Sequence, residues 1–118
     1  VAHTSLGQLV YLSALKHVDG VVGNSSSGLI EAPSLLTGTI NIGNRQRGRM
    51  QANNVINCEH DKDSIYQAVQ KAIHSRTYKK ELESCINPYG DGYSSERIVE
   101  ILSNVEINKM LLDKQITY

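Results

Sequence analysis

The chain has 118 residues, and its 12 Lys and Arg residues balance 12 Asp and Glu residues, so its formal net charge is zero. This length suits one domain, and the neutral balance argues against a dedicated nucleic-acid-binding protein, which would carry a basic excess. No apolar run approaches roughly 18 residues, so the sequence predicts no membrane span, and no basic-then-apolar signal segment opens the chain.

The first predicted elements are a helix, a short strand and a turn. Ser5 and Gln8 have the spacing of a capping box, and leucines recur after them at three- and four-residue steps. This pattern predicts a helix that ends at residue 16 or 17. A short buried strand is predicted over 18–23, and the turn 24–28 is rich in the Asn and Ser residues that begin helices.

A helix and two more strands follow. The pattern predicts a helix over 29–36, but Pro33 lacks a backbone donor and should kink this helix or end it early. A second strand is predicted over 38–43 and a third over 55–58. The polar loop 44–53 separates these two strands.

Three helical segments are predicted in the last part of the chain. Asp61 should cap a helix whose apolar face consists of Ile65, Ala68, Val69, Ala72 and Ile73. A short charged helix is predicted over 78–84, followed by a turn over 87–92. Ser94 or Ser95 should cap a last helix with apolar residues up to position 105. The pattern assigns no element after residue 108.

The alternation of short strands and helices indicates an α/β fold with a parallel sheet. Only three strands are visible, whereas a complete doubly wound domain has about five or six. Because the chain also begins with Val1 rather than Met, we expect it to be a piece of a longer protein. The absence of Phe and Trp predicts an aliphatic core.

The cysteines and histidines predict no metal or disulfide framework. Cys58 and Cys85 are far apart and form no CxxC motif, so we expect reduced, buried thiols in a cytoplasmic protein. The four histidines show no metal-ligand spacing with cysteines or carboxylates.

The segment Gly-Asn-Ser-Ser-Ser-Gly at 23–28 lies between a predicted strand and a predicted helix. Unpaired N–H groups, hydroxyls and small residues suit a phosphate or diphosphate, and ligands bind at this edge of a parallel sheet. A well-capped ordinary helix explains the same residues. Glu31 follows Ser27 by one helical turn, and it either holds a ribose diol or interacts with the helix dipole.

Three arginines follow the second predicted strand, at the same sheet edge as the serines. If the loop is extended, Arg45, Arg47 and Arg49 point the same way, and guanidinium groups match phosphate oxygens. The alternatives are a solvated loop, an interdomain ion-pair site and, more weakly, an RNA-binding loop. Asp91, between two glycines, is interpreted as a turn residue.

Three sequence blocks occur in a fixed order: Gly-Asn-Ser-Ser-Ser-Gly-Leu-Ile-Glu-Ala-Pro at 23–33, Ile-Asn-Ile-Gly-Asn-Arg-Gln-Arg-Gly-Arg at 40–49, and Tyr-Gly-Asp-Gly at 89–92. Together they resemble the C-terminal part of the UDP-N-acetylglucosamine 2-epimerases. The resemblance is greater to the hydrolysing branch, which makes N-acetylmannosamine or a relative for sialic-acid-type sugars. The non-hydrolysing branch has Ser-Gly-Gly and Arg-Pro-Glu where this chain has residues 25–27 and 45–47.

The resemblance implies two Rossmann-like domains that face each other across a cleft, as in a GT-B fold. Residues 1–118 would be a fragment of the C-terminal, UDP-binding domain: a partial Rossmann-like parallel sheet with flanking helices. The implied reaction eliminates UDP from a UDP-sugar and then adds water with inversion at C2, without a cofactor. Its catalytic residues lie outside this chain, so the chain alone is expected to be inactive, and the whole protein is expected to be a homo-oligomer. A GT-B glycosyltransferase and a non-catalytic nucleotide-binding module are the alternatives.

The resemblance also assigns nucleotide-binding residues. They are Leu6, Tyr11, Ser25, Ser26, Glu31 and Arg45. The two serines match residues that bind the UDP phosphates, and the glutamate matches the residue that holds the ribose. The arginine matches one at the nucleotide site, and the leucine and tyrosine belong to the segment that flanks the uracil.

Overall fold

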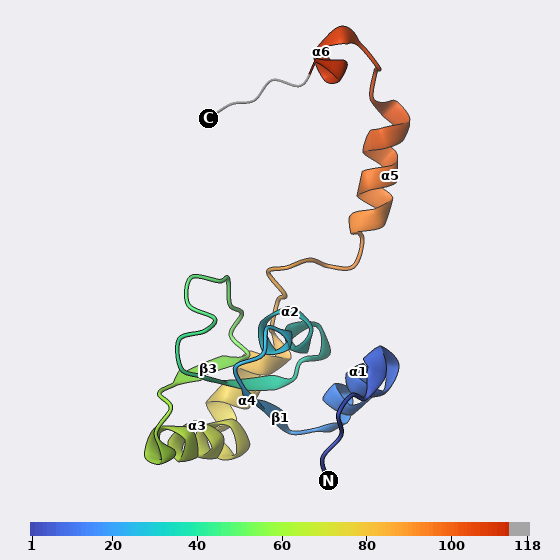
Figure 1. The fold of residues 1–118 in the computed structure, drawn as a ribbon. Coiled ribbons are helices and arrows are strands. Elements are labelled where there is room, and N and C mark those ends of the chain that lie inside the picture. The colour runs from blue at the N-terminus through green and yellow to red at the C-terminus, as the bar shows by residue number, and fades with distance from the viewer. Residues whose placement is uncertain (114–118) are drawn as a thin grey trace.

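The computed structural model describes residues 1–113, and the last five positions of the predicted fragment, 114–118, lie outside the described residues. The elements are α1 (Gly7–His17), β1 (Gly20–Gly23), α2 (Ser27–Ile30), the 3-10 helix η1 (Ala32–Leu35), β2 (Gly38–Ile42), β3 (Val55–Cys58), α3 (Lys62–His74), α4 (Arg76–Glu83), α5 (Ser94–Asn104) and α6 (Lys109–Leu112) (Figure 1).

The three strands form one parallel sheet in the order β1-β2-β3. In its register Val22 lies opposite Ile40, and Ile40 lies opposite Ile56. The predicted α/β fold with a parallel sheet is therefore confirmed, and the arrangement is that of half a Rossmann-like domain. Because the strands are parallel, the turn after β1, the loop after β2 and the residues after β3 all lie at one edge of the sheet.

Helices cover both faces of the sheet. Ile40 on β2 packs with Ala68 and Ala72 of α3 and with Tyr78 of α4. Its neighbour Thr39 points to the other face, where its hydroxyl donates to the carbonyl oxygen of Gly28 in α2. The core is thus aliphatic as predicted, apart from Tyr78, which is 3% exposed. The expectation of buried thiols is wrong, because Cys58 and Cys85 are both only half-buried.

A buried polar junction holds α2 against β2. The side chain of Asn54 is completely buried, and its Nδ2 donates to the carbonyl oxygens of Gly28 (3.0 Å) and Thr37 (3.1 Å). The Tyr78 hydroxyl donates to the carbonyl oxygen of Asn54 from the opposite side. A Cβ at Gly28 would lie 2.4 Å from Cγ2 of Thr39, so only glycine permits this close approach of helix and strand. The start of α2 is consequently held at the carboxyl edge of the sheet.

Two predicted helix caps are wrong. Ser5 and Gln8 do not form a capping box: Ser5 Oγ accepts a hydrogen bond from the N–H of Gly7, and α1 begins at Gly7. Gly7 has a φ of +67°, which takes the serine away from the amides of the first turn. The last predicted helix begins at Ser94, but no serine side chain caps it.

Two other local predictions are confirmed. Asp61 caps α3, and its Oδ1 accepts a hydrogen bond of 2.9 Å from the N–H of Ser64. The helix that contains Pro33 breaks: α2 ends at Ile30 and is followed by the short η1, with Leu36 in a left-handed conformation at its end.

The C-terminal helices stand apart from the sheet. Figure 1 shows α5 and α6 extending away from the body of the molecule, and no residue of α5 is buried. The exposed apolar side chains of α5 include Ile98, Ile101 and Leu102. Within residues 1–113, no helix is both long and apolar enough to cross a membrane.

Candidate functional site

The serine turn lies between the end of β1 and the start of α2. The N–H of Ser27 donates to Ser25 Oγ at 3.3 Å, and no side chain caps α2. The N–H groups of Ser25 and Ser26 have no acceptor within residues 1–113. Because α2 has only one turn, its dipole is small. An anion at this turn would therefore be bound mainly by these free N–H groups and by the serine hydroxyls.

Glu31 lies directly after α2. Its Oε2 atom is buried and has no hydrogen-bond partner among the described residues. A buried acceptor without a donor costs about 1–3 kcal/mol, and more when the group is charged. Vicinal hydroxyls, as in a ribose, supply the missing donors. The alternative in which Glu31 acts as a first-turn residue on the dipole of α2 is wrong, because Glu31 lies at the C-terminal end of that helix.

The loop after β2 is tied to the serine turn through one carbonyl group. The carbonyl oxygen of Asn24 accepts hydrogen bonds from Arg45 Nη1 at 3.1 Å and from Gln46 Nε2 at 2.7 Å. The structure therefore brings the exposed Arg45 next to the residue that precedes Ser25. The loop after β2 and the serine turn therefore lie at the same edge of the sheet, as expected.

The loop itself is not extended. It turns tightly, with the N–H of Arg47 donating to the carbonyl oxygen of Asn44 at 2.9 Å. The three arginines consequently do not form a row, which corrects the geometry expected for an extended loop. Arg45 contacts the serine turn, whereas Arg47 lines a different pocket.

Gln46 also belongs to this arrangement, although no sequence motif assigns it a role. Its side chain is 2% exposed, and its Oε1 is buried without a partner. No sequence pattern predicts this, because side chains alternate between two sides only in an extended strand and this loop turns tightly.

Leu6 directly precedes α1, and Tyr11 lies on α1 in contact with the serine turn. The hydroxyl of the half-buried Tyr11 lies 2.6 Å from Ser27 Oγ. Leu6 and Tyr11 line the same shallow hollow, together with His3, Ser5, Gly7 and Gln8. Five of the six assigned residues thus lie at or next to the turn, namely Tyr11, Ser25, Ser26, Glu31 and Arg45. Leu6 shares only the hollow with Tyr11.

Asp91 stabilises the turn before α5. Its Oδ1 accepts hydrogen bonds from the N–H of Tyr93 at 3.1 Å and from Arg97 Nη1 at 2.9 Å. The hydrogen bonds with Arg97 hold the pKa of the Asp91 carboxyl well below its usual range. These contacts agree with the interpretation of Asp91 as a turn residue.

Comparison with known proteins identifies similar sequences. A family model described as UDP-N-acetylglucosamine 2-epimerase matches residues 1–103. A UDP-N,N'-diacetylbacillosamine 2-epimerase (hydrolyzing) of Legionella pneumophila is 34% identical over 88% of this chain. A GDP/UDP-N,N'-diacetylbacillosamine 2-epimerase (hydrolyzing) of Campylobacter jejuni is 37% identical over 91% of the chain, and the polysialic acid biosynthesis protein P7 of Escherichia coli is 42% identical over 67%. The matched segments cover 26%, 27% and 20% of these relatives, respectively.

Proposed function

Since the chain belongs to the UDP-N-acetylglucosamine 2-epimerase family, we propose that it is the UDP-binding part of the C-terminal domain of a hydrolysing UDP-N-acetylglucosamine 2-epimerase. The chain matches only about a quarter of the length of its relatives, so the proposal concerns a protein with a second domain across a cleft. The family match favours this function over a glycosyltransferase or a nucleotide-binding module.

The observation that carries the proposal is the buried, unpartnered Oε2 of Glu31 next to the serine turn. A nucleoside diphosphate supplies both groups that this arrangement lacks. The ribose diol donates two hydrogen bonds to the carboxylate, and the diphosphate accepts from the N–H groups of Ser25 and Ser26. The spacing of one helical turn between serines and glutamate suits the short distance between ribose and phosphate.

The remaining assigned residues complete a nucleotide site in this proposal. Arg45, held beside the turn by Asn24, places a positive charge near the diphosphate. Leu6 and Tyr11 form the wall against which the uracil packs. Tyr11 also positions the serine turn, because its hydroxyl is used in the contact with Ser27.

The proposed reaction cleaves the bond between the sugar and UDP by elimination and then adds water, which yields N-acetylmannosamine and UDP. The word "hydrolyzing" in the names of two relatives supports the addition of water. The acid and base groups are assigned to the part of the protein outside residues 1–118, so this chain alone should show no turnover. We further propose a cytoplasmic protein that acts as a homo-oligomer.

The test compares UDP with 2′-deoxy-UDP by calorimetric titration of the complete protein. Glu31→Gln keeps the shape of the side chain but removes its charge, and the loss of a charged acceptor costs about 1.5–3 kcal/mol, or roughly tenfold to a hundredfold in UDP affinity. The wild-type protein should prefer UDP to the deoxy ligand, and the variant should largely lose this preference.

Glu83→Gln is the matched control, because Glu83 is exposed on α4, and it should change neither affinity. Equal affinities of the wild-type protein for the two ligands would contradict the assignment of Glu31 to the ribose.

A further inference from the structure

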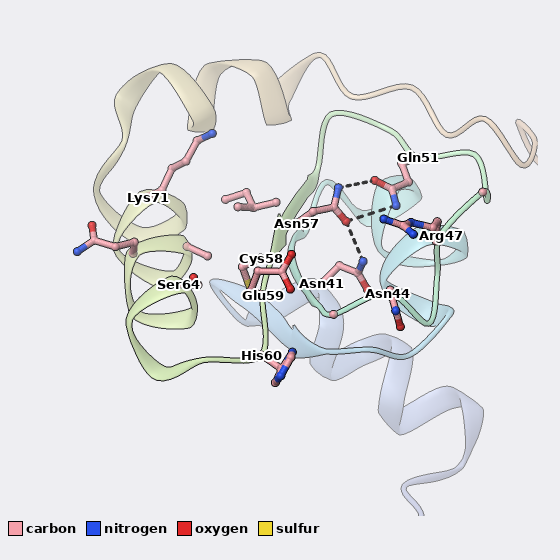
Figure 2. Close-up of a pocket in the computed structure, with 15 residues that line it drawn as sticks. Asn41, Asn44, Arg47, Gln51, Asn57, Cys58, Glu59, His60, Ser64 and Lys71 are labelled. Atoms are coloured by element: carbon pink, nitrogen blue, oxygen red, sulfur yellow. Dashed lines mark hydrogen bonds between the residues drawn. The ribbon is translucent and has the colours of Figure 1, made fainter.

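A second pocket lies between the loop after β2 and helix α3, and Figure 2 shows its lining side chains. Its volume is about 880 Å³, which is within the range of small-molecule sites. None of the six residues assigned to the nucleotide lines it. The pocket is therefore a separate candidate site at the same edge of the sheet.

One wall of this pocket is a network of side-chain amides. Asn41 Nδ2 donates to Asn57 Oδ1 at 2.8 Å, and Asn57 Nδ2 donates to Gln51 Oε1 at 2.8 Å (Figure 2). Gln51 Nε2 also approaches Asn57 Oδ1, at 3.4 Å. In this arrangement Asn57 Oδ1 is the acceptor, so the nitrogen of Asn41 faces Asn57.

The oxygen of the same Asn41 amide has no hydrogen-bond donor. Asn41 is 2% exposed, and its Oδ1 is buried and unpartnered within the described residues. Such an atom is costly in a folded protein unless a ligand or solvent supplies a donor. Since Asn41 lines the pocket, a hydroxyl or amide group of an occupant is suited to this role.

The charges of the pocket are mostly positive. Two cations, Arg47 and Lys71, line it with one carboxylate, Glu59. Neither Arg47 nor Lys71 forms an ion pair within residues 1–113. In Figure 2, Arg47 lies with Gln51 and Asn57, whereas Lys71 projects from α3 on the other side. An anionic group thus finds a cation beside the amide network, and Glu59 is available to accept from hydroxyl groups.

We propose that this pocket binds a small hydroxylated anion, namely a phosphorylated or carboxylated sugar. Its anionic group pairs with Arg47, and one of its hydroxyl groups donates to Asn41 Oδ1. Lys71 and Glu59 contact the remaining polar groups. This binding does not depend on the nucleotide site.

The test is a calorimetric titration of the complete protein with its nucleotide site saturated with UDP. The four probes are D-glucose 6-phosphate, D-glucuronate, inorganic phosphate and D-glucose. One of the two hydroxylated anions should bind at least about tenfold more tightly than both inorganic phosphate and glucose. The sugar anion that binds more tightly shows whether the pocket prefers a phosphate or a carboxylate. If UDP does not bind, the same titration without UDP still tests the pocket.

Exposed residues serve for the variants, so the fold is preserved. Arg47 and Lys71 line the pocket, so Arg47→Ala and Lys71→Ala should each weaken binding of the preferred probe about tenfold or more. Arg49, in the same loop as Arg47, and Lys62, on the same helix as Lys71, do not line the pocket. Arg49→Ala and Lys62→Ala should therefore leave binding unchanged. The proposal is overturned if neither sugar anion saturates below about 10 mM, if all four variants behave alike, or if UDP displaces the probe.

Discussion

The hydroxyl of Tyr11 lies 2.6 Å from Oγ of Ser27, and this hydrogen bond joins α1 to the first residue of α2. The two residues are 16 positions apart, and the strand β1 runs between them. The contact determines where the wall formed by α1 stands relative to the serine turn. It therefore links the proposed uracil wall to the proposed phosphate site.

Replacement of this hydroxyl should weaken nucleotide binding modestly. In Tyr11→Phe the ring remains, but Ser27 loses its partner, which costs about 0.5–1.5 kcal/mol. We expect UDP affinity to fall a few-fold in a calorimetric titration. Tyr66→Phe removes a hydroxyl from an exposed tyrosine on α3 and should have no effect. A loss of the same size in both variants would argue against a positioning role of Tyr11.

The close approach of α2 to β2 should not tolerate a side chain at position 28. Gly28→Ala places a methyl group 2.4 Å from Cγ2 of Thr39, and such overpacking costs about 1–3 kcal/mol of unfolding free energy. UDP affinity should also fall, because α2 moves away from the sheet edge. Urea unfolding of the complete protein measures the first effect, and titration measures the second.

A double variant separates this clash from other effects. Thr39→Ser removes the methyl group but keeps the hydroxyl that donates to the carbonyl oxygen of Gly28. The loss of unfolding free energy in Gly28→Ala/Thr39→Ser should therefore be smaller than the sum of the losses in the single variants. Strictly additive losses would show that the clash is not the cause.

The ion pair before α5 should make the first turn of this helix sensitive to acid. Since the folded-state pKa of Asp91 is lowered from 3.8, its contribution is fully present above about pH 4 and disappears as the pH falls through the lower folded-state value. The protection of the amides near Tyr93 against hydrogen exchange, relative to their intrinsic rates at the same pH, should fall in this range. The effect should be local, because α5 buries no side chain.

The variant Asp91→Asn should show this lower protection already at neutral pH, because it cannot pair with Arg97. Asp63→Asn changes an exposed carboxylate on α3 and should leave exchange in α5 unaltered. A normal carbon chemical-shift titration of the Asp91 carboxyl, with its midpoint near 3.8, would contradict the prediction.

The order of the elements follows from local sequence patterns. The alternating strands and helices, the cap at Asp61 and the break at Pro33 depend on residues a few positions apart, and all three are observed. The resemblance of three blocks to a known family likewise depends on residue order alone. The capping box at Ser5 fails within the same range, because the positive φ of Gly7 overrides the spacing.

The contacts that assemble the site depend instead on the register of the sheet. Gln46 reaches Asn24 across 22 positions, and Asn54 reaches Gly28 across 26, because the loops after parallel strands meet at one edge. The same packing leaves Glu31 Oε2 and Asn41 Oδ1 buried without a donor from residues 1–113. The sequence by itself determined the order of the strands and of the longer helices, since these follow from neighbours along the chain. It did not predict the short α6 (Lys109–Leu112). Only the tertiary structure decided which polar atoms are paired, because pairing requires distant segments to be packed at hydrogen-bond distance.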